Sequence, residues 1–292
     1  MWRVPTLAGP PQSDRIAASI YDAQHPGSAP EGVNNFSCVP STQRPRPVVL
    51  AHGTNATTYR DFSALAPLLI ADGYCVFALD YGGMGGDNFG SQDIRTSAAQ
   101  FGTFVSQVLA ATGAGTVDAI GYSQGATVTR YYINKLGGAR NVSSWVGIAS
   151  PSYGGIMYGL VPIVQAVPGG VDLVERVTST AVAQQMQGSA FLAELNGGSD
   201  TVPGVRYTTI ASRFDEMIQP FTNIALRGAG ATNLVLQDEC PRNGSGHFRS
   251  VYDPNVQDLV RRALDPDTVP RVPCEVVPVG AGIPQIVLQS NS

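Results

Sequence analysis

The sequence predicts an α/β protein with a mostly parallel central sheet and helices on both faces. Two observations predict it: short apolar runs of strand length alternate with segments of helical periodicity, and glycines end several of the predicted helices. Helices that connect parallel strands bury both faces of the sheet. The length of 292 residues suits one domain of this kind, so we expect a single domain over 1–292.

The first 46 residues are expected to form a loop-like arm that wraps the fold. They are rich in Pro, Gly, Ser and Asn and show no sustained periodicity. Regular structure is expected to begin at Val48–Ala51, a β-branched run bounded by Pro47 and His52 that predicts a buried strand.

The following segments continue the alternation of helices and strands. In chain order we predict a helix over Asp61–Asp72 ended by Gly73, a strand over Tyr74–Leu79, a glycine-rich loop at 82–86, a helix over Ser91–Thr112 ended by Gly113, a strand over Val117–Gly121, a helix to about Leu136, strands over Val142–Ala149, Val205–Ala211 and Leu234–Gln237, and a helix over Val256–Leu264. No internal repeat is visible.

Two segments lie outside this alternation. An insertion at about 153–202 separates two predicted strands, and its first half, Ile156–Val167, is apolar. The insertion is either a lid or rim that touches lipid droplets or a set of helices packed on the core, and both interpretations stay open. The proline-rich tail at 265–292 is expected to be extended on the surface.

Charge and composition restrict the partners. The formal net charge is −4, and no basic cluster is denser than Arg261-Arg262, so nucleic acid is excluded as an expected partner. Charged residues make up 14% of the chain, against roughly 25% in an average soluble protein, which suits contact with apolar material. The longest uncharged stretch, Asn141–Val171, is interrupted by prolines and glycines, so no transmembrane segment is predicted.

The four cysteines are Cys38, Cys75, Cys240 and Cys274. They form no CxxC pair, so we expect no metal ion and no cofactor. Three disulfide pairings are possible, of which the sequential one is the simplest; the alternative is four buried free thiols in a cytosolic enzyme. We favour disulfides and therefore an oxidising, extracellular location, although residues 1–11 lack the features of a signal peptide.

The pentapeptide at 121–125 carries the chemistry. It reads Gly-Tyr-Ser-Gln-Gly, a G-x-S-x-G motif between a predicted strand and a predicted helix, which is typical of the nucleophile elbow of the α/β-hydrolase fold. Small residues at the ends allow the tight turn, and the head of the helix favours negative charge beside Ser123. We therefore predict that Ser123 is a nucleophile.

A serine nucleophile needs a general base, and the chain has three histidines. In this fold the chain order is serine, acid, histidine, which excludes His25 and His52 because both precede Ser123. His247 remains, in a loop past the last predicted strand, and is the predicted base.

Asp215 is the predicted acid, because it lies on the loop at the carboxyl end of the strand Val205–Ala211. Asp238, at the end of the last predicted strand, is the alternative, and its simpler interpretation is a cap or turn residue near Cys240. Three other candidates, Asp172, Glu175 and Glu194, are interpreted as solvated charges on helices, and Asp200 lies ahead of a strand. Glu216 and Glu239 are also acidic candidates between Ser123 and His247, without an assigned role.

The oxyanion formed during ester hydrolysis needs two hydrogen-bond donors. One is expected to be the backbone N–H of Gln124, directly after the nucleophile. The other is expected from the loop after the first strand, where we choose Thr54, with its hydroxyl as an extra donor. His52 is then a structural or pocket-shaping residue.

Three motifs together resemble a known family: His52-Gly53-Thr54, the G-x-S-x-G pentapeptide, and the run Phe214–Pro220. They are similar to the class 2 lipases of actinobacteria and, more distantly, to the yeast lipase B type, over about residues 36–275. The resemblance implies that the D-E-x-[IV]-x-P run carries the acid, which favours Asp215, and that Thr54 and Gln124 supply the oxyanion donors. It also implies the disulfides Cys38–Cys75 and Cys240–Cys274.

These expectations describe a secreted, monomeric carboxylic ester hydrolase of the triacylglycerol lipase or esterase type, working through an acyl-enzyme on a lipid or other ester substrate, with a lipid–water interface as a further partner. Alternatives within enzymes are a short-chain esterase, a polyester or cutin esterase, and an acyltransferase. A catalytically inactive binding module of the same fold is the alternative from another class.

Overall fold

The structure is a computed structural model that describes residues 1–85, 88–156, 160–267 and 269–281. Three parts of the segments discussed above lie outside the described residues: Gly86 of the glycine-rich loop, Met157 and Tyr158 of the insertion, and the tail beyond residue 281.

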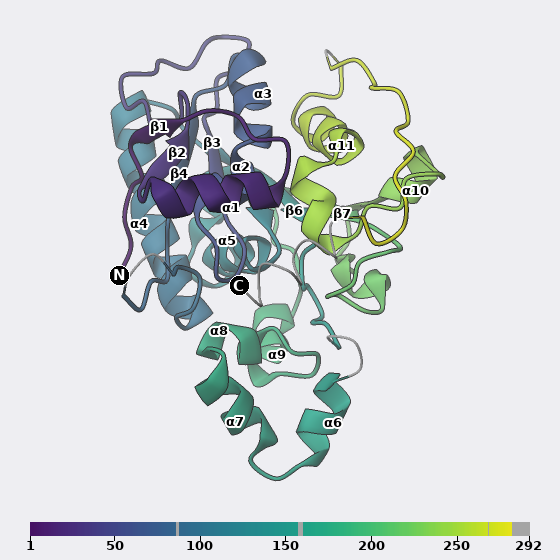
Figure 1. Ribbon diagram of the computed structural model, residues 1–292. Coiled ribbons are helices and arrows are strands. Elements are labelled where there is room, and N and C mark those ends of the chain that lie inside the picture. Colours follow the sequence, from purple (N-terminus) through teal and green to yellow (C-terminus); the bar gives the residue numbers. More distant parts are fainter. Residues whose placement is uncertain (86–87, 157–159, 268, 282–292) are drawn as a thin grey trace.

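Within the described residues, the main sheet has six strands in the order β4-β3-β5-β6-β7-β8, and every neighbouring pair is parallel (Figure 1). The predicted mostly parallel sheet is therefore confirmed. The strands are β3 (Val48–Ala51), β4 (Val76–Leu79), β5 (Val117–Tyr122), β6 (Val142–Ile148), β7 (Arg206–Ala211) and β8 (Thr232–Val235).

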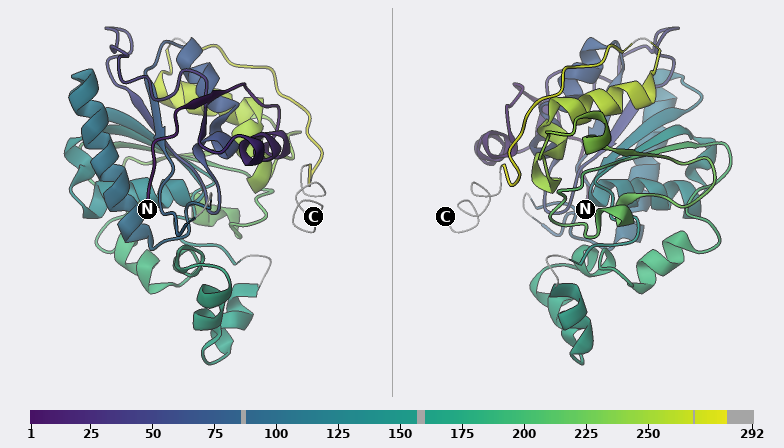
Figure 2. Two further views of the ribbon diagram at one scale, coloured as in Figure 1. Left: turned by 60° about the vertical axis from the view of Figure 1, so that its left-hand side comes forward. Right: turned by 90° about the vertical axis from the view of Figure 1, so that its right-hand side faces the viewer.

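Both faces of the sheet are buried under helices, as the left view of Figure 2 shows. Alternate residues of a strand point to opposite faces: Val49 of β3 belongs to the hydrophobic core under α4 (Ile94–Thr112) and α5 (Gln124–Lys135), and Leu50 to the core on the other face. That second core is covered by α2 (Thr58–Phe62), α3 (Leu65–Ala71) and α11 (Pro254–Leu264). The strands therefore read as continuous apolar runs.

The prediction of a loop-like arm is wrong for part of residues 1–46. Residues 15–24 form α1 (Arg15–Gln24), and β1 (Leu7–Gly9) pairs in parallel with β2 (Ser28–Pro30). The Asp14 side chain caps α1 by accepting hydrogen bonds from two backbone N–H groups. A ten-residue helix depends on tertiary packing, here against α2, and that contact is not visible in local periodicity.

Two further boundaries differ from the prediction. The helix expected over Asp61–Asp72 is two helices, α2 and α3, and the first begins at Thr58 because the Thr57 side chain caps it. The last strand, β8, ends at Val235, and α10 (Leu236–Glu239) follows it. Asp238 therefore lies on a short helix and not at the end of a strand.

The insertion contains four helices among its described residues: α6 (Leu160–Ala166), α7 (Gly170–Val177), α8 (Thr180–Gln184) and α9 (Ala190–Asn196). Figures 1 and 2 show α6 and α7 projecting away from the body, whereas α8 and α9 lie against it. Ala181 of α8 and Leu195 of α9 are fully buried in the core beside α4 and α5. The interpretation as helices packed on the core is therefore confirmed for α8 and α9, and both interpretations stay open for α6 and α7.

Short 3₁₀ helices complete the described elements: η1 (Gly138–Arg140), η2 (Phe221–Ile224) and η3 (His247–Tyr252). No helix in the described part of the chain is long and apolar enough to cross a membrane.

Candidate active site

Ser123 lies at the sharp turn between β5 and α5. Its backbone has φ 51° and ψ −122°, a conformation that is strained for a residue with a Cβ atom. The flanking positions require glycine: a Cβ at Gly121 would lie 2.3 Å from the backbone nitrogen of Ala126, and one at Gly125 would lie 1.9 Å from the carbonyl oxygen of Ala51. The motif therefore builds a turn that presents Ser123 at the carboxyl edge of the sheet.

His247 comes to Ser123 from 124 residues further along the chain. Its Nε2 is 3.0 Å from Ser123 Oγ, and its Nδ1 is 2.9 Å from Asp215 Oδ2. Both the imidazole and the carboxylate are buried. The imidazole can therefore accept a proton from the hydroxyl on one side while it donates to the carboxylate on the other.

Asp215 is fixed by three hydrogen bonds. Its Oδ1 accepts from the backbone N–H groups of Met217 (2.9 Å) and Ile218 (2.7 Å), which leaves Oδ2 for His247. Asp238, the alternative acid of the sequence analysis, is exposed and forms an ion pair with Arg213. Of the two candidates, only Asp215 contacts His247.

The remaining acidic candidates occupy other positions. The buried Asp200 accepts from the backbone N–H groups of Arg227 and Gly228 and from the Tyr153 hydroxyl, so it closes a loop at a distance from Ser123. The exposed Glu194 forms an ion pair with Arg95.

Glu216 is an acidic candidate of the sequence analysis to which no role was assigned there. Its Oε2 accepts the backbone N–H of His247 at 2.5 Å, and burial, with a further contribution from the charge of Asp215, raises the pKa of its carboxyl. A Cβ at Gly246 would lie 2.1 Å from Glu216 Oε1, so a larger residue before His247 would displace this carboxylate. The only signal for Glu216 in the sequence is its position next to Asp215.

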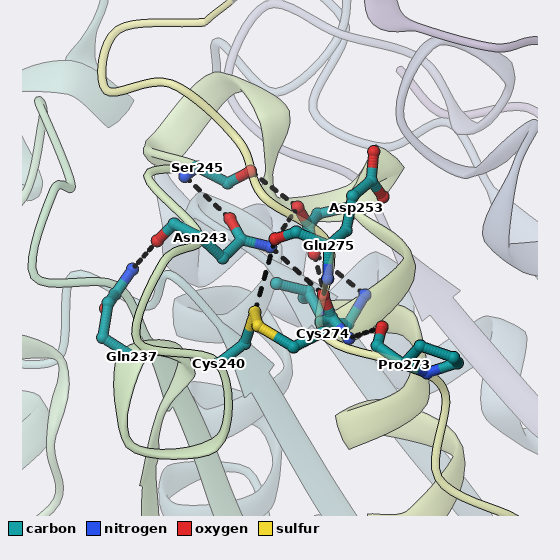
Figure 3. The surroundings of a disulfide bond; sticks show 10 residues. Gln237, Cys240, Asn243, Ser245, Asp253, Pro273, Cys274 and Glu275 are labelled. Atoms are coloured by element: carbon teal, nitrogen blue, oxygen red, sulfur yellow. Dashed lines mark hydrogen bonds between the residues drawn. A yellow bond between two sulfur atoms is a disulfide. The ribbon is translucent and has the colours of Figure 1, made fainter.

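The loop that carries His247 is held by a network around Asp253 (Figure 3). Asp253 Oδ2 accepts from Asn243 Nδ2 (2.8 Å) and Ser245 Oγ (2.6 Å), while its Oδ1 caps α11. Gln237 Nε2 donates to the carbonyl oxygen of Asn243 at 2.8 Å. One buried carboxylate thus ties the histidine loop to the first turn of α11.

The structure contains both disulfides of the sequential pairing, Cys38–Cys75 and Cys240–Cys274. Figure 3 shows the second one beside the Asp253 network, where it attaches the tail to the start of the histidine loop. The tail is also held there by a hydrogen bond from Gly244 N to the carbonyl oxygen of Val277.

This arrangement predicts that the two disulfides differ in their effect on activity. The loops that they close have similar sequence separations, 37 and 34, so each pair of Cys→Ser changes should destabilise the fold by about 2–4 kcal/mol. At a temperature where both variants are folded, only the loss of Cys240–Cys274 should lower the rate of ester hydrolysis, because that disulfide restrains the loop of His247. Equal rates of the two variants, measured with circular dichroism as the folding control, would contradict this prediction.

The loop after β3 lies next to Ser123. His52 is fully buried and stacks on Tyr81 with ring centroids 4.2 Å apart. Burial lowers the pKa of His52, so its imidazole is neutral at pH 7. Thr54 follows two residues later. Its Oγ1 accepts a hydrogen bond of 3.1 Å from Nε2 of Gln185, the residue directly after α8. His52 therefore shapes the loop, while Thr54 reaches the pocket.

Ser123, His247 and Thr54 line one cavity of about 240 Å³. Its other walls are mostly apolar: Tyr122, Val182, Met217, Ile218 and Phe248, with Gly53, Gly155, Asn55, Gln185 and Arg15 at the polar positions. A largely apolar pocket with a few convergent polar groups is typical of a small-molecule site. Arg15 comes from the arm, which the sequence analysis did not connect with the site.

The family model described as lipase (class 2) matches residues 45–255. Among solved structures, the chain is similar to lipase B of Aspergillus fumigatus, with a TM-score of 0.62 and 19% identity over 85% of this chain and 56% of that one. It is also similar to the mature lipase BlEst2 of Bacillus licheniformis, with a TM-score of 0.56 and 17% identity over 77% of this chain and 93% of that one. An esterase of Exiguobacterium antarcticum has a TM-score of 0.51, 18% identity and coverages of 75% and 91%.

Proposed function

The chain belongs to the class 2 lipase family and has the fold of its lipase and esterase neighbours, and on this premise we propose that it is a serine hydrolase of carboxylic esters. Ser123 is the nucleophile, His247 the general base and Asp215 the acid that orients the imidazole. The observation that carries this proposal is the continuous hydrogen-bonded series from Ser123 Oγ through His247 to Asp215 Oδ2.

The reaction proceeds in two halves. His247 Nε2 takes the hydroxyl proton as Ser123 Oγ attacks the ester carbonyl carbon, and the same proton then passes to the departing alcohol oxygen. Water next attacks the acyl-enzyme, giving its proton to His247, and the acid leaves as the proton returns to Ser123. Asp215 holds the tautomer in which Nδ1 carries a proton and Nε2 is free to accept one.

The oxyanion is bound by the backbone N–H groups of Thr54 and Gln124. Because Gln185 donates to Thr54 Oγ1, the Thr54 hydroxyl can direct its own proton into the pocket and serve as a third donor. Donors of this kind are usually the largest electrostatic contribution to acyl transfer.

The substrate class is a lipid or another ester with an apolar acyl chain, since the cavity walls are mostly apolar. A panel of p-nitrophenyl esters and triglycerides of increasing chain length tests this. We expect the protein to hydrolyse at least one of these esters and to lose this activity when Ser123 is inactivated. Transfer of the acyl group to an alcohol in preference to water would favour the acyltransferase alternative. If the protein turns over none of these esters, the result would favour the alternative that it is a catalytically inactive binding module.

The projecting helices α6 and α7 are the part of the insertion that we propose to meet a lipid–water interface. They carry exposed apolar side chains, with Ile163 64% exposed, Leu173 60% and Val177 70%. We expect the rate on an emulsified triglyceride to rise above its solubility limit, and the combined change Leu173→Ser and Val177→Ser to reduce that rise without affecting a soluble ester.

The control for this experiment is Val39→Ser, which removes an apolar side chain that is 83% exposed on the arm. It should leave the response to the emulsion unchanged. A wild-type rate that does not rise above the solubility limit would rule out an interfacial role for α6 and α7.

We also propose that the arm at 1–46, the insertion at 153–202 and the tail at 265–292 are parts of one hydrolase domain that acts as a monomer. Two disulfides support an oxidising, extracellular setting for this domain.

A further inference from the structure

We propose that a buried ion pair between Arg15 and Asp61 positions the oxyanion-binding loop, so that the N-terminal arm is a working part of the active site. The proposal rests on the proposed function, in which the backbone N–H of Thr54 binds the oxyanion. Arg15 and Asp61 are positioning residues: they act on the reaction through the loop at 52–55.

Asp61 joins the arm to this loop. It lies on α2, and its side chain is fully buried. One carboxylate oxygen, Oδ2, accepts the backbone N–H of Gly53 at 2.7 Å, and the other pairs with Arg15 of α1. The Asp61 carboxylate therefore connects Arg15, which lies 46 residues earlier in the chain, to Gly53, the residue immediately before Thr54.

The hydrogen-bonded residue, Gly53, is packed against the nucleophile. A Cβ at Gly53 would lie 3.3 Å from Asp61 Oδ2, 3.3 Å from Tyr122 Cδ1 and 3.4 Å from Ser123 Cβ. Any movement of Gly53 relative to Ser123 changes the direction of the next backbone N–H, that of Thr54. Hydrogen bonds to a transition state require positions held to within about 0.5 Å, so the anchor on Gly53 controls the geometry of the oxyanion donor.

Other hydrogen bonds also hold the loop. The Tyr81 hydroxyl donates to the carbonyl oxygen of His52, and His52 Nδ1 lies 2.8 Å from the carbonyl oxygen of Gly53. Gln185 holds the Thr54 side chain, and Ser91 Oγ donates to Asn55 Oδ1 at 2.9 Å. Among these contacts, Asp61 is the one that accepts the Gly53 N–H, directly before the Thr54 donor.

Arg15 is needed because an unpaired carboxylate is costly to bury. Burial opposes the charge on Arg15, but Asp61, together with Tyr122 and Tyr252, outweighs the effect of burial and raises the pKa of Arg15 above its ordinary value. The Arg15 side chain is 21% exposed and lines the cavity that contains Ser123. The guanidinium thus neutralises Asp61 at the wall of the pocket itself.

The ion pair between Arg60 and Asp22 provides a matched control. It joins the same two helices, α1 and α2, and the exposures agree: 21% and 1% for its two side chains, against 21% and 0% for Arg15 and Asp61. Among the described residues, neither Arg60 nor Asp22 forms a hydrogen bond with Gly53. A purely mechanical role in attaching the arm would make both pairs equally important for activity.

The test is a double-mutant cycle on Arg15→Met and Asp61→Asn, with Arg60→Met as the control and steady-state hydrolysis of p-nitrophenyl butyrate as the assay. Each single change should lower kcat by about 10- to 100-fold with little change in KM. Arg15→Met leaves the carboxylate uncompensated, and Asp61→Asn turns an amide N–H₂ group toward the guanidinium. The double variant should recover most of the activity, because the Asn oxygen still accepts from Gly53 and its amide no longer faces a cation.

A second readout separates positioning from a general loss of structure. A boronic acid forms a tetrahedral adduct with the serine oxygen, and its inhibition constant should rise in the single variants by about the factor by which kcat/KM falls. Arg60→Met should change neither value. If Arg15→Met does not fold, Asp61→Asn alone carries the test.

Three results would overturn the inference: full kcat in Asp61→Asn, a loss in Arg60→Met equal to that in Arg15→Met, or a double variant no better than the single ones. These are distinct from a failure of the proposed function, which would appear as a wild-type protein that hydrolyses no ester or whose activity survives the loss of Ser123.

Discussion

Replacing Ser123 with alanine is expected to lower kcat for ester hydrolysis by about 10⁴-fold or more. Without Oγ no acyl-enzyme forms, and the oxyanion donors and pocket alone give only weak catalysis. The fold should persist, because Ser123 uses its backbone, through the N–H bonded to the carbonyl oxygen of Ile148, to hold the turn. Alanine also removes no packing volume larger than one oxygen atom.

The measurement is steady-state hydrolysis of a p-nitrophenyl ester, with thermal unfolding recorded in parallel. Ser144→Ala is the control. Ser144 is a buried serine near the start of β6, at the end of the strand away from Ser123, and its hydroxyl accepts a hydrogen bond from Arg206. It should retain kcat within about threefold. Near-normal activity in the Ser123 variant would show that another group attacks the ester.

Asp215→Asn is expected to have the second largest effect, a fall in kcat of about 10⁴-fold. In the native protein Oδ1 accepts two backbone N–H groups, so an asparagine at this position would keep its oxygen there and turn its amide N–H₂ group toward His247 Nδ1. That group can only donate, which favours a proton on Nε2 and removes the acceptor for the serine proton.

Asp238→Asn is the matched control for this prediction. It makes the same chemical change on the exposed α10, where it removes a surface ion pair with Arg213, and surface pairs contribute little to stability. We expect kcat within about twofold of the wild type. The pH dependence of kcat/KM should be measured for both variants, and a loss confined to Asp238→Asn would reverse the assignment of the acid.

The sequence predicts those parts of the fold whose signals are local. The strands β3 and β5 are short apolar runs because both of their faces are buried, and the elbow at Ser123 is recognisable because only glycine fits on either side of it. The chain order of the fold then leaves His247 as the only histidine after Ser123. Asp215 follows from its place at the end of a strand.

The remaining features depend on contacts between distant segments. Helix α1 is short, and its packing on α2 is invisible in the composition of the arm. The sequence gives Glu216 no distinguishing feature except its place beside Asp215. Its contact in the site is with the backbone N–H of His247, which lies 31 residues further along the chain. The pairing of Arg15 with Asp61 is likewise a product of tertiary structure.

The proposed activity requires that Ser123 is the reactive serine and that His247 activates it. Treatment with a fluorophosphonate probe, followed by mass-spectrometric mapping of the peptides, tests this. We expect one adduct, on Ser123, formed much more slowly in His247→Ala and at the wild-type rate in Asp238→Asn. An adduct on a different residue, with Ser123 unmodified and ester hydrolysis still present, would contradict the assignment of Ser123 as the nucleophile.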